Sequence, residues 1–337
     1  MSLEVMGITA LWIFLYGYLM VASIDFGAGF FAFYGKLTKQ DHIMNHLVRR
    51  YISPVWEVTN VFFVFFLVGL VGFFPDTAFY FGTALLIPGS IALLLIVIRG
   101  SFYAFGNYGS KDNIIYLFVY GATGLLIPAS LSTALTISEG GFLSQKGVHV
   151  DFLAKQLFMS PYSWSVVFLA IVSVLFISAG FLTFYADRAN DIQAREILRK
   201  FALFWSTPTI IASFLVFIAL HEHNSKHFEK AMHIWWMFGL SLVFFLIASF
   251  LIYKRKYFGT AFIMIMLQFF FAFFGYGASH LPYILYPFIT IHASVTNPSM
   301  GTALIFAFIA GLCLLIPALY LLLKLFLFDA DYSKRKK

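Results

Sequence analysis

The sequence predicts an all-α, polytopic membrane protein with nine transmembrane helices, and three observations lead to this prediction. Hydrophobic residues make up 61% of the 337 residues and charged residues only 11%, with a mean hydropathy of +0.88, whereas soluble domains carry about 25% charged residues. The apolar residues form runs that reach the roughly 20 helical residues needed to cross a bilayer. Lysines and arginines are dense in alternate connections between these runs.

The nine expected spans follow one another through short connections. The first is long for one crossing, so we expect a tilted helix or one that projects from the membrane. Pro54, Pro161 and Pro298 lie at or near span starts, where proline is tolerated. Four further prolines lie inside spans, where neighbouring helices must satisfy the freed carbonyl groups: Pro88, Pro128, Pro208 and Pro317. The spans cover residues 5–34, 54–75, 77–99, 114–137, 161–186, 201–221, 232–253, 258–282 and 303–327.

The basic residues predict the orientation. Of the 22 lysines and arginines, 18 follow the odd-numbered spans and 4 follow the even-numbered ones. By the positive-inside rule the N-terminus is outside and the C-terminus inside. We expect one membrane domain over residues 1–328 and a charged cytoplasmic tail over 329–337. Spans one to four and five to eight could form two four-helix bundles, with the ninth helix peripheral.

The composition also excludes several classes. The net charge of +7 resides in connections that set orientation, so it gives no indication of nucleic-acid binding. Cys313 is the single cysteine, which excludes an internal disulfide and a thiolate metal site. The first apolar run contains an acid and lacks a basic leader, so we interpret it as a span and not as a cleavable signal peptide.

An acidic residue inside the first span needs a physical explanation. Asp25 interrupts an apolar, glycine-rich stretch, and a carboxylate there costs about 2.5–3.5 kcal/mol on insertion scales. Such a residue persists where it faces protein or water and has a partner or a function. Gly27, Ala28 and Gly29 follow it, and small residues let another helix approach closely. We therefore expect Asp25 on a closely packed helix.

A second acid, Glu57, lies near the start of span two, which begins on the inner side. At 1.5 Å per residue it lies within a few helical turns of Asp25 in depth, and Asn60 shares its helix face. These groups could pass protons inward from the inner water phase, as intramembrane acids often do. Alternatively, Glu57 reaches the interface and Asp25 only bonds a neighbouring helix. Arg99 could pair with either acid, although an interfacial anchor is the favoured role.

The positions of the nine histidines argue against a haem in this chain. Membrane haem needs imidazoles deep within spans, and every histidine here lies in a connection or at a span end. Glu139, followed by Gly140 and Gly141, indicates a turn after span four. Three histidines and an acid after span six could hold a metal ion, although a solvated loop is the favoured interpretation. These residues are His221, Glu222, His223 and His227.

Motifs at both ends of the chain carry a family resemblance. The first two are Gly17 with Ile24-Asp25-Phe26-Gly27-Ala28-Gly29, and Ser53-Pro54-Val55-Trp56-Glu57 leading to Asn60-Val61. Weaker ones are Leu281-Pro282-Tyr283, His292-Ala293-Ser294-Val295-Thr296 and Leu315-Ile316-Pro317. With these motifs and nine spans, the chain resembles subunit II of the cytochrome bd-type quinol oxidases. It departs from that family at Glu57, where many members have Asp, and at Thr59, which replaces an expected amide.

The resemblance implies a non-haem subunit of a terminal oxidase that oxidises a membrane quinol and reduces oxygen to water. Two haem b and one haem d would reside in subunit I, the partner in a heterodimer, so this chain would hold no complete active site and no cofactor of its own. Asp25 and Glu57 would line a proton route from the cytoplasmic side, supported by Asn60 and Arg99. A bound quinone and a small single-helix subunit are left open. The location would be the cytoplasmic membrane of a prokaryote.

Two rival hypotheses start from the same residues. Intramembrane acids and proline-broken helices also suit a proton-coupled secondary transporter. However, nine spans do not divide into inverted halves, and no substrate-sized polar cluster lies mid-membrane. A purely structural membrane partner is the third option, in which replacing Asp25 and Glu57 affects assembly only. The oxidase subunit is the preferred hypothesis.

Overall fold

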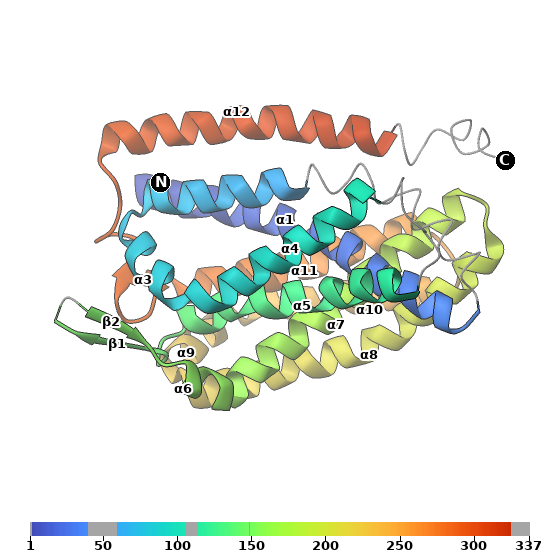
Figure 1. Ribbon diagram of the computed structural model, residues 1–337, viewed down its shortest axis with the longest axis horizontal. Helices are drawn as coiled ribbons and strands as arrows, with labels where there is room; N and C mark the ends of the chain where they lie inside the picture. The colour runs from blue at the N-terminus through green and yellow to red at the C-terminus, as the bar shows by residue number, and fades with distance from the viewer. Residues whose placement is uncertain (1, 40–58, 106–113, 148, 325–337) are drawn as a thin grey trace.

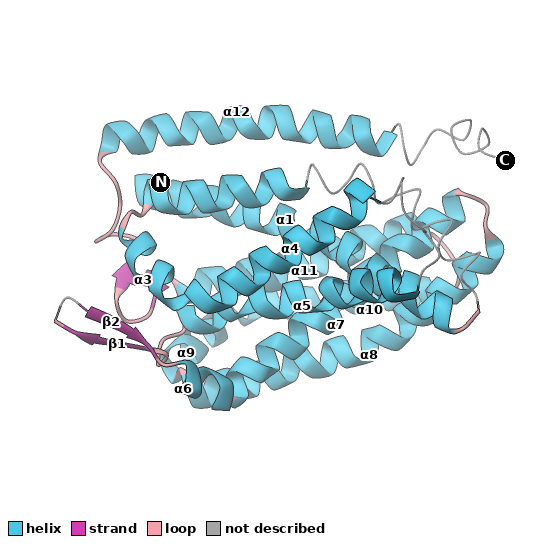
Figure 2. Ribbon diagram, viewed as in Figure 1, coloured by secondary structure: helices cyan, strands magenta, loops and turns pink. Residues whose placement is uncertain are grey.

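The computed structural model shows long helices that run side by side (Figure 1). It describes residues 2–39, 59–105, 114–147 and 149–324, so Glu57 and the charged tail 329–337 lie outside it. Figure 2 shows that the chain is mostly helix, with its few strands gathered at one end of the bundle. The predicted helical class is therefore confirmed, although the strands were not expected.

Seven of the described helices are long and apolar enough to cross a membrane. They lie close to the expected spans, and capping residues set several of their starts. Asp191 accepts a hydrogen bond from the Ala194 backbone N–H at 3.0 Å, so the sixth expected span begins earlier than predicted. The seven are α1 (Leu3–Leu37), α5 (Ile114–Ser138), α7 (Pro161–Arg188), α8 (Ile192–His223), α10 (Trp235–Tyr253), α11 (Phe258–His280) and α12 (Pro298–Leu323).

The third expected span is broken into two helices. α3 (Asp76–Ala84) and α4 (Leu86–Phe105) meet at an angle of 79°, and the pair counts as an eighth span if it crosses as one unit. Pro88 explains the break, because it has no N–H to donate to the Ala84 carbonyl and its ring clashes with that group. The prolines expected inside the other spans do lie within α5, α8 and α12.

The second expected span is described only in part. Residues Thr59–Phe73 form a shorter apolar helix, and the residues that precede it lie outside the described ranges. The described residues therefore contain seven to eight candidate spans by length and composition. Nine crossings and the predicted orientation stay predictions.

Short elements close one end of the bundle, here called the hairpin end. They lie where the sequence analysis expected connections, at the left in Figure 1. Both hairpins are antiparallel, and in the first of them Leu143 lies opposite Phe152. The elements are β1 (Leu143–Lys146), β2 (His149–Phe152), α6 (Ala154–Met159), α9 (Ser225–His233), β3 (Tyr283–Leu285) and β4 (Ile289–Thr290).

Helix α1 lies at the centre of the packing. It contacts α5, α7, α11 and α12, and it contributes to both large apolar clusters, with Phe31 in one and Phe14 in the other. Both rings are fully buried. α12 runs along one edge of the bundle (Figure 1). Because α1 contacts helices from both expected halves, the division into two four-helix bundles stays a prediction.

Candidate functional site

Asp25 lies inside the bundle, on the buried side of α1. Only 2% of its surface is exposed, and the residues on either side of it, Ile24 and Phe26, are buried as well. The glycine-rich stretch of α1 packs against α5 and α7 at this level. The carboxylate is therefore surrounded by protein groups, which must supply the interactions that water would otherwise provide.

Arg99 of α4 supplies two of these interactions. Its Nε donates to Asp25 Oδ2 at 2.9 Å and its Nη2 to the Asp25 carbonyl oxygen at 2.6 Å. Its Nη1 donates to the carbonyl oxygen of Tyr120 in α5 at 2.8 Å. The favoured expectation of an interfacial anchor was wrong, since Arg99 is only 1% exposed. The guanidinium finds a carboxylate and two carbonyl acceptors within the protein, so it does not need the interface.

Two residues of α5 complete the site and were not predicted from the sequence. The Tyr120 hydroxyl donates to Asp25 Oδ1 at 3.2 Å, and its ring centre lies 4.1 Å from Arg99 Cζ, within cation–π range. Thr123 Oγ1 accepts a bond from Arg99 Nη1 at 3.4 Å. The two residues are three positions apart, so they share one helix face. Gly124 on the same helix was the available signal, because small residues mark close helix contacts.

Glycines make this arrangement possible. A Cβ at Gly27 would overlap Ser178 of α7, and one at Gly124 would overlap the Phe26 carbonyl group. At Gly29 it would lie 2.8 Å from the Tyr120 carbonyl oxygen, closer than real Cβ contacts. The predicted close approach of other helices to the glycine-rich part of α1 is therefore confirmed, with α5 and α7 as the partners.

A cavity of about 290 Å³ lies beside the site, between α4 and α5. Arg99, Tyr120 and Thr123 form part of its wall, and the others come from the C-terminal half of α4 and the N-terminal half of α5. This is the part of the bundle remote from the hairpin end. This space therefore lies next to two residues that contact the Asp25 carboxylate, Arg99 and Tyr120. The full lining is Ile98, Arg99, Ser101, Ile115, Tyr116, Val119, Tyr120 and Thr123.

Only part of the second half of the expected relay, Glu57 with Asn60, lies within the described residues. Glu57 lies outside the described residues. Asn60 lies in the first turn of the helix Thr59–Phe73 and is half-buried. The structure thus joins Asp25 to Arg99, whereas a link from Glu57 and Asn60 to Asp25 stays a prediction.

The histidines after span six do not form the solvated loop that was favoured. They end α8 and form part of α9. His221 is exposed, and its Nδ1 lies 3.4 Å from Glu222 Oε1. The ring of His223 stacks on the rings of Phe142 and Tyr162. His227 is buried and faces Glu139, which lies in the predicted turn after α5 but is only 1% exposed. The four residues named from the sequence therefore do not converge on one metal ion.

Comparisons with known proteins agree with one another. A family model described as cytochrome bd terminal oxidase subunit II matches residues 3–326. The chain is 31% identical to the putative cytochrome bd menaquinol oxidase subunit II of Bacillus subtilis (strain 168), over 98% of this chain and 97% of that protein. It is also similar to a chain of the bd oxidase structure from Geobacillus thermodenitrificans, with 55% identity and a TM-score of 0.86. That match covers 98% of this chain and 100% of the other.

Proposed function

This chain belongs to the cytochrome bd terminal oxidase subunit II family, and we propose that its Asp25 site serves a proton route from the cytoplasmic side to the oxygen-reducing centre of its partner. The chain is a subunit of a quinol oxidase, an oxidoreductase complex in the membrane, and the family places the haems in a partner subunit. Reducing one oxygen molecule to two waters consumes four electrons and four protons. A route for those protons through apolar helices needs polar groups, and Asp25 with its partners supplies them.

The two oxygens of Asp25 have different roles in this proposal. Oδ2 accepts a hydrogen bond from Arg99 Nε, whereas Oδ1 accepts one from the Tyr120 hydroxyl. We assign proton uptake to Oδ1, because the neutral hydroxyl beside it can pass on a proton, whereas the guanidinium beside Oδ2 stays protonated. Tyr120 also lines the cavity, and a tyrosine hydroxyl can donate one hydrogen bond and accept another, so we assign it the step between water in the cavity and Oδ1. Arg99 keeps the carboxylate oriented and balances its charge.

The remaining features of the proposal follow from the chain as a whole. Seven long helices, the α3–α4 pair and the helix Thr59–Phe73 support nine crossings, with the hairpin end outside. Glu57 and Asn60 would extend the proton route toward the cytoplasm. The haem-bearing subunit I would complete a heterodimer with two haem b and one haem d, which supply the electron transfer and oxygen chemistry. We place the complex in the cytoplasmic membrane of a prokaryote, with menaquinol as donor by analogy with the Bacillus subtilis relative's name.

Oxygen consumption by the purified complex tests the proton role. We expect Asp25→Asn to lower quinol-driven turnover about 100-fold, the lower end of the range that positioned proton-transfer groups contribute. The haem absorption per complex should remain unchanged. Asp151→Asn, which makes the same change at an exposed position of β2, is the matched control and should keep full turnover. Unchanged turnover in Asp25→Asn with intact haem would remove the proton role.

A solvent isotope measurement separates slow proton delivery from a damaged site. If Asp25 carries the protons, turnover of Asp25→Asn should fall further in heavy water than turnover of the unmodified complex. Equal isotope effects in the two complexes would mean that the substitution slows a step other than proton transfer.

A further inference from the structure

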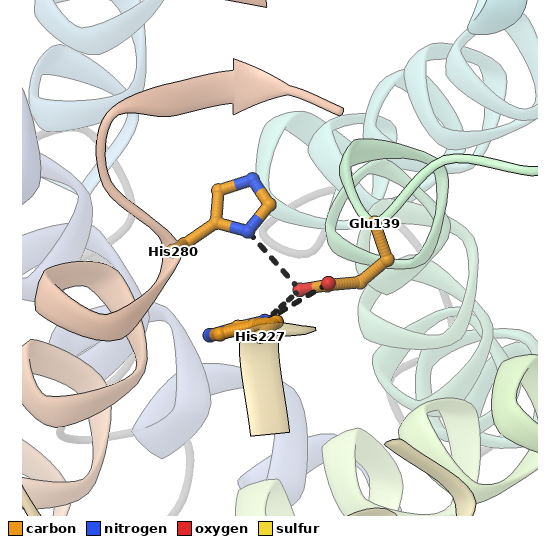
Figure 3. Close-up of side chains that lie close together, drawn as sticks. All are labelled: Glu139, His227 and His280. Carbon is orange, nitrogen blue, oxygen red and sulfur yellow. Dashed lines mark hydrogen bonds and ion pairs between the residues drawn. The ribbon is translucent and has the colours of Figure 1, made fainter. Parts of the chain in front are cut away.

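A second polar cluster is buried at the hairpin end, far along the bundle from Asp25. Glu139 directly follows α5, His227 lies within α9, and His280 is the last residue of α11. Figure 3 shows their three side chains converging from these different elements. Glu139 and His227 are 1% and 4% exposed, and the His280 side chain is 10% exposed. The cluster shares only His227 with the group of histidines that the sequence suggested.

The donor atoms of this cluster point toward one another. His227 Nδ1 lies 2.8 and 2.9 Å from the two carboxylate oxygens of Glu139, and His280 Nδ1 lies 3.3 Å from Oε1. One ligand atom from each residue can be chosen so that all lie within 4.8 Å of one another. Two imidazole nitrogens and one carboxylate form a ligand set that zinc commonly uses, with a fourth position left for water.

The surrounding hydrogen bonds show which ring atom carries a proton. The Ser279 hydroxyl donates to the Tyr276 carbonyl oxygen at 2.8 Å, so its oxygen accepts from His227 Nε2 at 2.7 Å. With the proton of a neutral ring on Nε2, Nδ1 presents a lone pair to the Glu139 carboxylate. Two lone pairs at this distance repel unless a positive charge lies between them. A proton or a metal cation must therefore occupy the position between His227 Nδ1 and Glu139.

The outer contacts match those of a metal centre. A histidine that binds a metal usually donates its other N–H to a neighbouring acceptor, which is the role of Ser279 for His227. Tyr276 donates its hydroxyl hydrogen to Glu139 Oε1 at 2.5 Å, and Asn224 Nδ2 donates to Oε2 at 3.1 Å. These bonds fix the carboxylate while leaving both oxygens directed at the histidines.

The ring of His280 is positioned by packing, since it stacks on Tyr276 with the ring centres 5.9 Å apart. Its Nδ1 faces the Glu139 carboxylate, whereas its Nε2 is buried and has no hydrogen-bond partner among the described residues.

We propose that Glu139, His227 and His280 bind one zinc ion, which joins the ends of α5 and α11 to α9 at the hairpin end. The bound ion would be taken from the aqueous phase at that end and would hold α9 against the bundle. This site is separate from the proposed proton route, because Glu139 follows the C-terminal end of α5, whereas Tyr120 lies in the N-terminal half of that helix. The competing arrangement is a buried imidazolium–carboxylate pair without metal.

Zinc binding to the purified whole complex distinguishes the two arrangements. The complex is stripped with a chelator, titrated with zinc chloride alone, and its zinc content is measured by mass spectrometry after dialysis. We expect the unmodified complex to retain one more zinc per complex than His280→Gln and Glu139→Gln. His233→Gln, an exposed histidine at the end of the same α9, is the matched control and should retain the unmodified content.

Two further measurements keep the test decisive if a ligand variant fails to assemble. Ser279→Ala removes only the hydrogen-bond partner of His227, and we expect it to weaken zinc binding by about tenfold or more. X-ray absorption at the zinc edge should show nitrogen and oxygen ligands at about 2.0–2.1 Å. Equal zinc content in the unmodified complex and the ligand variants, or unchanged affinity in Ser279→Ala, would overturn the proposal in favour of the imidazolium pair.

Discussion

Asp25 and Arg99 form a buried ion pair, and replacing Arg99 should destabilise the protein more than replacing Asp25. Arg99→Met removes the guanidinium from the Asp25 carboxylate and from the Asp25 and Tyr120 carbonyl oxygens, while the Tyr120 hydroxyl still donates to Oδ1. Breaking a buried ion pair in this way costs about 3–5 kcal/mol. Asp25→Asn leaves Arg99 with both carbonyl acceptors and the Tyr120 ring, so we expect a smaller cost of about 1–3 kcal/mol.

The double variant Asp25→Asn, Arg99→Met gives the sharper test. In it no unpaired charge remains, so the two costs should not add, and the double variant should be more stable than Arg99→Met alone. The apparent melting temperature of the purified complex and its haem content per protein rank the stabilities of the two single variants and the double variant. Arg255→Met is the matched control, because its side chain is 61% exposed and its pair with Glu196 contributes no more than about 1 kcal/mol.

Two results would refute this reasoning. One is an Asp25→Asn complex that is no more stable than Arg99→Met. The other is a double variant whose loss of stability equals the sum of the single losses. Either would mean that the guanidinium and the carboxylate do not depend on each other for their burial.

Two further predictions concern packing and orientation. Gly27→Ala places a Cβ against Ser178 and should destabilise the chain by about 1–3 kcal/mol in thermal unfolding. Gly82→Ala in α3 is the control, because open space surrounds its Cβ and we expect no such loss of stability. Equal effects of the two substitutions would contradict the close contact of α1 and α7. In a Cys313→Ser background, Lys155→Cys at the hairpin end should react with a membrane-impermeant maleimide in intact cells, and Lys256→Cys should react only after permeabilisation. The reverse pattern would invert the proposed orientation.

The sequence predicted the membrane spans well because span length is set by one strong constraint. Within hydrocarbon the backbone must satisfy its own hydrogen bonds, so any long apolar run becomes a helix. The break at Ala84 was readable in principle from Pro88, but hydropathy alone cannot separate a proline that kinks a span from one that divides it. The hairpins were missed because they are short and lie in polar connections, where no alternation of apolar and polar residues identifies a strand.

The two buried polar sites were predicted unequally, and the reason is physical. Asp25 is conspicuous because a lone acid in an apolar helix has no local explanation. Glu139 lies beside two glycines and His227 beside other charged residues, so both resemble ordinary connecting segments. Only the folded chain brings Glu139, His227 and His280 together, since each comes from a different helix end. A single sequence carries no signal for that convergence.

Gly29, Gly124 and Arg99 depend on one another in the structure, although the sequence carried no sign of a link between them. Arg99 Nη1 lies 3.1 Å from the position of a Cβ at Gly29 and 3.3 Å from that of a Cβ at Gly124. A methyl group at either glycine would therefore intrude on the guanidinium. The absence of side chains at these two positions lets α1 and α5 approach, and it also leaves room for the cation that the acid requires. A membrane helix that buries Asp25 thus needs its glycines for electrostatic reasons as well as for packing.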